Sequence, residues 1–205
     1  MKRLLAAGYP RVFQISKCFR QGERGSRHLP EFTLLEWYRA QTNYLGLMDE
    51  CEELVTFVLE ELGLPPVLEF QGQPLDLHRP WQRLTVQEAF ERYASAPLDQ
   101  AVQSGRFDEL LAFEIEPSLG FPRPLFLYRY PSSLAALARL SREAPGYAER
   151  FELYAAGLEL ANAFSELTDP VEQRARFDTE SAKRKEQGKT VYPMADKFLR
   201  SLSHM

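Results

Sequence analysis

Apolar and polar residues alternate along two stretches near the start of the chain. Residues 12–19 are rich in β-forming side chains and alternate with period two, and residues 32–38 repeat the pattern with more aromatic rings. The segment 21–30 between them holds two glycines and several charges. The pattern predicts a long β-hairpin with a cationic tip.

A helical period follows the predicted hairpin. Apolar residues in 47–62 are spaced by three and four, and Gly63 ends that helix. Residues 65–80 combine prolines, glycines and short apolar runs, which indicates an irregular connector. Thr85 and Glu88 then form the capping box of a further helix.

The middle of the chain mixes short helices with strands. We expect a helix over 99–113, a short buried strand over 125–130 and a short helix over 132–140. Residues 150–155 and 158–165 alternate as two strands joined by a tight turn, which predicts a second hairpin.

Helices are predicted at both ends of the chain. Residues 2–7 have the pattern of the end of a helix, and residues 195–202 form a last amphipathic segment. Asp169 and Pro170 occupy favoured cap and first-turn positions of a polar helix that ends at Gly188. Antiparallel hairpins separated by helices predict an α+β fold.

Composition narrows the functional classes. A chain of 205 residues with 44% hydrophobic content is long enough to form one core, so one globular unit is expected. The net charge of −4 disfavours a broad nucleic-acid-binding face. Cys18 and Cys51 are too few for a disulfide framework, and no apolar run approaches the roughly 20 residues that span a bilayer. We therefore expect a soluble, cytoplasmic protein with two free thiols.

Two predicted strand faces have chemically useful side chains. Period two groups Phe32, Leu34, Glu36 and Tyr38 on one strand, and Asn162, Phe164 and Glu166 on another. Carboxylates pair with an ammonium group while rings pack its alkyl stem, so such faces suit a ligand with an ammonium group on an alkyl stem. An ordinary half-buried strand has the same alternation, and that interpretation stays open.

Charged residues suggest a second kind of ligand. The predicted first loop holds Arg20, Arg24, Arg27 and His28, opposed only by Glu23. Guanidinium groups bind phosphate oxygens by paired hydrogen bonds, so a triphosphate fits this loop. Glu152 and Glu159 are candidate ligands for Mg²⁺ beside it. A solvated hairpin tip and surface carboxylates are the alternatives.

Longer motifs resemble one enzyme family. The segment CFRQGERGSRHLPEFTLLEWY (18–38) resembles motif 2 of class II aminoacyl-tRNA synthetases in its lysine-specific form, and GLELANAFSELTD (157–169) is similar to the lysine-pocket strand of that branch. Residues 116–141 and 149–169 look like the elongation factor P lysine ligases, the lysyl-tRNA synthetase paralogues also called GenX or PoxA.

The resemblance implies a fold and its extent. We expect the class II synthetase-like antiparallel sheet flanked by helices, with residues 1–205 as a single partial catalytic domain and 64–147 as its connecting region. Neither motif 1 nor the glycine-rich motif 3 of the family is recognisable. We therefore expect weak or no adenylation by this chain alone, and the homodimer of the family is not carried over.

The resemblance also implies roles for single residues. Arg20 would stabilise charge on the α-phosphate of ATP, Phe32 would stack on adenine, and Arg27 with His28 would bind the outer phosphates. The chain departs from the family pattern at two positions: Gly22 stands where the family has the glutamate that contacts adenine, with Glu23 following it as a candidate ATP-binding residue, and Leu29 replaces a usual asparagine. The implied lysine ligands are Glu36, Tyr38, Ala161, Asn162, Phe164 and Glu166, and the implied Mg²⁺ ligands are Glu152 and Glu159.

Three functions follow as expectations. The first is ATP-dependent activation of lysine or β-lysine to an adenylate, with transfer to a lysine of elongation factor P. Ala161 favours this reading, because tRNA-charging relatives usually have glycine there and alanine is associated with acceptance of β-lysine. The second is a lysyl-tRNA synthetase fragment that charges tRNA. The third is a non-catalytic lysine-binding paralogue.

Overall fold

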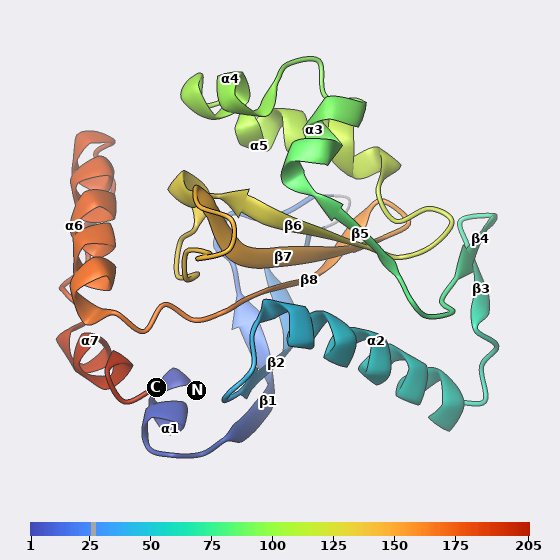
Figure 1. The fold of residues 1–205 in the computed structure, drawn as a ribbon, viewed down its shortest axis with the longest axis horizontal. Coiled ribbons are helices and arrows are strands. Elements are labelled where there is room, and N and C mark those ends of the chain that lie inside the picture. The colour runs from blue at the N-terminus through green and yellow to red at the C-terminus, as the bar shows by residue number, and fades with distance from the viewer. Residues whose placement is uncertain (26–27) are drawn as a thin grey trace. The chain divides into compact units, whose positions relative to one another are not determined.

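The computed structural model describes residues 1–25 and 28–205. The chain divides into two compact units, one formed by residues 1–41 with 168–205 and the other by 42–167. Both units combine helices with antiparallel strands (Figure 1). The predicted α+β class is confirmed.

The first unit contains the predicted N-terminal hairpin. Strands β1 (Arg11–Phe19) and β2 (Glu31–Arg39) pair antiparallel over their whole length. Exposure alternates along β1, because successive side chains point to opposite faces. Gln14 lies opposite Glu36 in this register.

Three helices complete the first unit: α1 (Lys2–Ala6), α6 (Pro170–Glu186) and α7 (Asp196–Leu202). The start of α6 is fixed by its sequence, because the Asp169 carboxylate accepts hydrogen bonds of 2.8 and 3.2 Å from the backbone N–H groups of Val171 and Glu172. The predicted positions of all three helices are confirmed to within a few residues.

A four-stranded sheet forms the centre of the second unit. Its order is β5 (Gln82–Thr85), β6 (Leu125–Pro131), β7 (Tyr147–Ala155) and β8 (Leu158–Phe164). Strands β6, β7 and β8 pair antiparallel, whereas β5 pairs parallel to β6. The pair β7–β8 is the predicted second hairpin. Its turn residue Gly157 has a φ of 71°, a value that glycine adopts without strain.

Short helices cover one side of this sheet (Figure 1). They are α3 (Val86–Tyr93), α4 (Leu98–Gln103), α5 (Phe107–Leu110), the π-helical turn η1 (Leu111–Ile115) and the 3₁₀ turn η2 (Glu116–Ser118). The capping box predicted at Thr85 is present at the start of α3. Buried rings from these helices and from the sheet form the main core, including Phe90 and Phe107, whose centroids lie 5.2 Å apart.

Helix α2 (Tyr44–Glu61) lies on the other side of the sheet and contacts β7 and β8 (Figure 1). Its N-terminus is capped by Asn43, whose side-chain oxygen accepts from the backbone N–H groups of Leu45 and Gly46 at 3.1 and 3.2 Å. The predicted helix over 47–62 is confirmed. None of the helices in the described residues is long and apolar enough to cross a membrane.

Three predicted segments differ from the structure. The helix expected over 132–140 is wrong: only a 3₁₀ turn, η3 (Ser132–Leu134), forms there, and Ala138 instead makes a β-bridge to Glu166. The connector over 65–80 contains a small hairpin, β3 (Val67–Phe70) with β4 (Gln73–Asp76). The helix expected over 99–113 is interrupted between α4 and α5, where Gly105 has a φ of 70°.

Candidate functional site

One face of the N-terminal hairpin holds an anchored carboxylate. The Glu36 carboxylate accepts a hydrogen bond of 2.5 Å from the Gln14 amide on the facing strand, and another of 2.6 Å from the Tyr38 hydroxyl. Both donors fix the orientation of a half-buried acid. Gln14 was not predicted as a site residue from the sequence, although it lies within the alternating pattern of the first strand.

Arg20 follows β1 immediately and lies beside an aromatic ring. Its backbone N–H donates to the Pro30 carbonyl at 2.9 Å, and its guanidinium carbon lies 5.2 Å from the centre of the Phe32 ring. An exposed ion pair of 3.3 Å joins Arg20 to Glu23. Arg20 thus lies beside both Glu23 and Phe32.

The tip of this hairpin is described only in part. The His28 carbonyl accepts a hydrogen bond of 3.2 Å from the Gly25 backbone N–H, and the His28 side chain is exposed. Arg27, a predicted phosphate ligand, lies outside the described residues.

A second polar cluster surrounds the buried Glu152 on β7. One carboxylate oxygen of Glu152 accepts from the hydroxyls of Tyr130 and Tyr154, at 2.5 and 2.7 Å. The other oxygen accepts from Arg150 at 2.6 Å and from the Asn162 amide at 3.0 Å. The guanidinium of Arg150 also lies 4.4 Å above the Tyr130 ring. The charge of a buried acid is thereby balanced by an arginine and three further donors.

This cluster raises the pKa values of its tyrosines. Burial raises the pKa of Tyr130 well above the ordinary value because a buried phenolate loses its hydration, and the nearby Glu152 charge adds to the effect. The pKa of Tyr154 is raised by the same two causes. Both hydroxyls therefore remain protonated donors to Glu152 throughout the physiological pH range.

The β7–β8 register decides which predicted residues share a face with Glu152. Asn162 lies opposite Glu152 and Phe164 lies opposite Arg150, so these side chains share one face. Ala161 lies opposite Leu153 and faces the other side of the sheet. An effect of Ala161 on amino acid choice therefore has to act through the strand backbone or through that other face. Arg150 was not singled out from the sequence, although it stands two residues before Glu152.

Glu166 lies just beyond β8 in a backbone segment held on several sides. Its neighbour Ser165 is buried, and the Ser165 hydroxyl accepts a hydrogen bond of 3.0 Å from the Tyr44 backbone N–H. The Ser165 carbonyl accepts from the Arg139 backbone N–H at 2.8 Å. These hydrogen bonds fix the position of the backbone next to Glu166.

The predicted Mg²⁺ ligands fit a metal poorly as they stand. A carboxylate has about four lone-pair directions, and four donors already occupy those of Glu152. Glu159 is exposed and lies opposite Tyr154. Among the described residues, no group of three or more His, Cys, Asp or Glu side chains could hold a metal ion.

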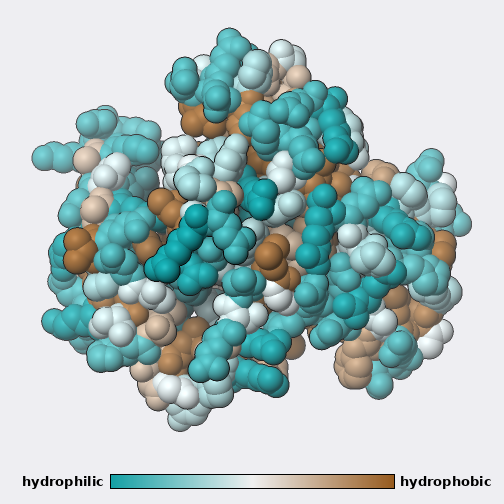
Figure 2. All heavy atoms as spheres, in the orientation of Figure 1, coloured by the Kyte–Doolittle hydropathy of each residue, from teal (hydrophilic) through white to brown (hydrophobic). Residues whose placement is uncertain are grey.

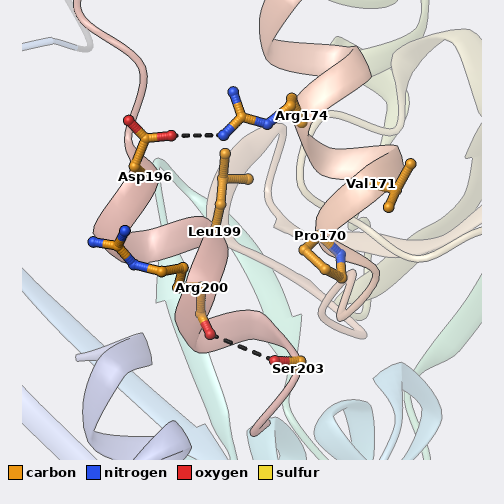
Figure 3. Close-up of a pocket in the computed structure, with 7 residues that line it drawn as sticks. All are labelled: Pro170, Val171, Arg174, Asp196, Leu199, Arg200 and Ser203. Carbon is orange, nitrogen blue, oxygen red and sulfur yellow. Dashed lines mark hydrogen bonds and ion pairs between the residues drawn. The ribbon is translucent and has the colours of Figure 1, made fainter.

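A cavity of about 450 Å³ lies between α6 and α7 in the first unit (Figure 3). Its polar lining includes Arg174, whose guanidinium binds the Asp196 carboxylate at 2.6 Å, and Leu199 supplies an apolar wall. No residue predicted to bind ATP, lysine or Mg²⁺ lines this cavity. The residues predicted to bind these ligands thus lie elsewhere in the chain.

Comparison with known proteins identifies the family. A profile of the class II tRNA synthetases (D, K and N) matches residues 1–202. The chain belongs to this family. The family fits a fold built on antiparallel strands that carry acids and aromatic rings, and it agrees with the motif resemblance found in the sequence.

The relatives fall into two groups. The elongation factor P–(R)-β-lysine ligase of Enterobacter sp. is 41% identical over 98% of this chain and 64% of its own length. The corresponding ligase of Edwardsiella ictaluri is 40% identical over 100% of this chain and 64% of its own length. The lysine–tRNA ligase of Moorella thermoacetica is 37% identical over 100% of this chain and 46% of its own length. The chain thus spans about half to two thirds of the length of these relatives.

Proposed function

We propose that this class II synthetase chain takes part in ATP-dependent activation of lysine or β-lysine, followed by transfer to a lysine of elongation factor P. The observation that carries the proposal is the orientation of Glu36. Its carboxylate is held by Gln14 and Tyr38 on a face suited to an ammonium group. The similarity to two elongation factor P–(R)-β-lysine ligases over nearly the whole chain supports the choice of acceptor.

The first reaction requires no nucleophilic side chain. A carboxylate oxygen of the amino acid attacks the α-phosphorus of ATP, a bond to that phosphorus forms, and pyrophosphate leaves. Arg20 stabilises the charge that builds on the α-phosphate, and Phe32 stacks against adenine. Positioning and electrostatic stabilisation therefore supply the rate.

In the second reaction the acceptor lysine attacks the activated carbonyl. Its neutral ε-amine forms an amide bond to the acyl carbon, AMP leaves, and the amine loses a proton. Coordination of Mg²⁺ by Glu152 and Glu159 stays a prediction, and neither reaction is assigned a step through the metal.

The predicted amino acid ligands come from two places, strand β2 and the segment 161–166 that includes the end of β8, and each is tested alone. Titration calorimetry with lysine and with β-lysine would be performed on the purified chain and on the variants Glu36→Gln and Glu166→Gln. Each substitution should weaken amino acid binding by about tenfold or more, because it removes a charge-assisted contact between a carboxylate and the ammonium group. Glu69→Gln, an exposed carboxylate on β3, is the matched control.

Activity is measured separately from binding. Lysine-dependent exchange of pyrophosphate into ATP measures the first reaction, and robust exchange would support the proposed chemistry. An absence of lysine and β-lysine binding would contradict the proposal itself.

A second candidate is a lysyl-tRNA synthetase activity, favoured by the whole-chain match to the Moorella thermoacetica lysine–tRNA ligase. Incubation with ATP, lysine and tRNA would produce lysyl-tRNA under this hypothesis, whereas elongation factor P would stay unmodified. Amino acid binding without any nucleotide binding would instead favour a non-catalytic paralogue.

A further inference from the structure

Helix α2 carries a second apolar face that stays open to solvent among the described residues. Its inner face is buried, whereas Leu54, Phe57, Val58 and Leu62 lie on the outside. Phe57 is 57% exposed and Leu62 is 66% exposed. We call these four residues the α2 stripe.

The spacing of the α2 stripe makes it continuous. Leu54, Phe57 and Val58 stand at positions i, i+3 and i+4, which adjoin on a helix, and Leu62 follows one turn later. Leu64 and Val67, which follow the helix in the sequence, are also exposed apolar residues. Figure 2 shows apolar atoms reaching the surface in the region of α2 and the β3–β4 hairpin. A surface helix that meets only water normally has polar residues there.

The segment of sequence that contains the stripe is acidic. Residues 40–78 contain eight Asp and Glu and no Lys or Arg. Glu52, Asp49 and Asp76 are paired with arginines from later in the chain. Glu60 and Glu61 are exposed at the distal end of the stripe, and within the described residues they form no ion pair.

This charge decides what can cover the stripe. If two copies packed α2 against α2, their glutamates would meet and repel each other, which opposes self-association. A partner with apolar residues flanked by Lys or Arg would bury the stripe and pair the glutamates at once. Amphipathic helices present such residues at the same three- and four-residue spacing.

We propose that the α2 stripe docks a basic amphipathic helix of another protein. This surface lies outside the predicted lysine and ATP ligands, so the inference is independent of the proposed function. Docking depends on two features together. The apolar residues of the stripe supply the buried area, and the exposed Glu60 and Glu61 favour a partner with positive charge.

The test uses a labelled synthetic peptide of lysine and leucine, about five helical turns long, with leucine at helical spacing. Fluorescence anisotropy measures its affinity for the whole 205-residue chain. The double variant Phe57→Ser with Leu62→Ser should bind at least about tenfold more weakly, because central apolar anchors dominate such interfaces. The single variant Phe113→Ser, which removes a ring that is 79% exposed on η1, should bind like the wild type.

The charge requirement is tested in parallel. Glu60→Gln with Glu61→Gln should weaken binding several-fold and flatten its dependence on salt near ~0.1 M, where screening acts over about 10 Å. The control pair Asp99→Asn with Asp108→Asn removes two exposed acids from α4 and α5 and should have no effect.

Three results would overturn the docking proposal. In the first, a peptide of the same composition with scrambled leucines binds equally well, which indicates unspecific attraction. In the second, the stripe variants bind like the wild type. In the third, sedimentation equilibrium shows a dimer that the stripe variants abolish, which makes a second copy the occupant. Circular dichroism of each variant establishes that it is folded.

Discussion

The hydroxyl of Tyr130 on β6 donates a hydrogen bond of 2.5 Å to the carboxylate of Glu152 on β7. This contact joins two strands through a buried acid that also binds Arg150 and Asn162. The cluster therefore stabilises the central sheet, and it also contains two predicted site residues, Glu152 and Asn162.

Removing the charge of Glu152 should destabilise the protein. In Glu152→Gln, Arg150 loses its buried partner, which typically costs about 3 kcal/mol. Urea unfolding should show a lower midpoint with an unchanged slope. The control Glu109→Gln breaks an exposed ion pair with Arg106 and should change the midpoint little. Equal effects of the two substitutions would contradict a structural role for the cluster.

The buried tyrosines should make the fold sensitive to alkali. In the folded state the pKa values of Tyr130 and Tyr154 are raised, mainly by burial and then by Glu152. Between the unfolded value of about 10 and the higher folded value, the folded state binds more protons. Stability is therefore complete below about pH 10 and falls as the pH rises above it.

Alkaline unfolding followed by circular dichroism checks this dependence. Tyr154→Phe should be less stable at neutral pH but lose less stability as the pH rises above about 10. The exposed Tyr192→Phe should behave like the wild type. An unchanged alkaline slope in Tyr154→Phe would argue against the shift.

Gln14 should support lysine binding without contacting the amino acid. Its amide orients Glu36 across the hairpin, so Gln14→Leu should weaken lysine binding by about tenfold. Calorimetry with lysine measures the change. Thr33→Ala, on the exposed opposite face of β2, is the control. Wild-type affinity in Gln14→Leu would mean that Glu36 needs no cross-strand donor.

The two free cysteines should differ sharply in reactivity. Burial raises the pKa of the Cys51 thiol to about 12, so almost no thiolate forms near neutral pH. Cys18 is only partly buried on β1. Brief treatment with iodoacetamide should add one group to the native protein, located at Cys18 by peptide mass analysis, and two after denaturation. Rapid native labelling of Cys51 would contradict its burial.

Local sequence determined much of the fold. The alternation in 12–19 and 32–38 predicted β1 and β2, and the capping box at Thr85 placed the start of α3. Such signals are reliable because they depend on side-chain period and on hydrogen bonds within one turn. The motif at 18–38 likewise indicated the family to which the chain belongs.

Long-range contacts decided the rest. Residues 132–140 have helix-forming side chains, but the backbone of Ala138 pairs with Glu166, and that pairing outweighs local propensity. The four hydrogen bonds to Glu152 come from three strands, so no spacing in the sequence could reveal that its carboxylate is fully occupied. The amino-acid sequence by itself therefore determined which chemically active side chains the protein has. Only strand pairing and burial decided which of those groups already have partners.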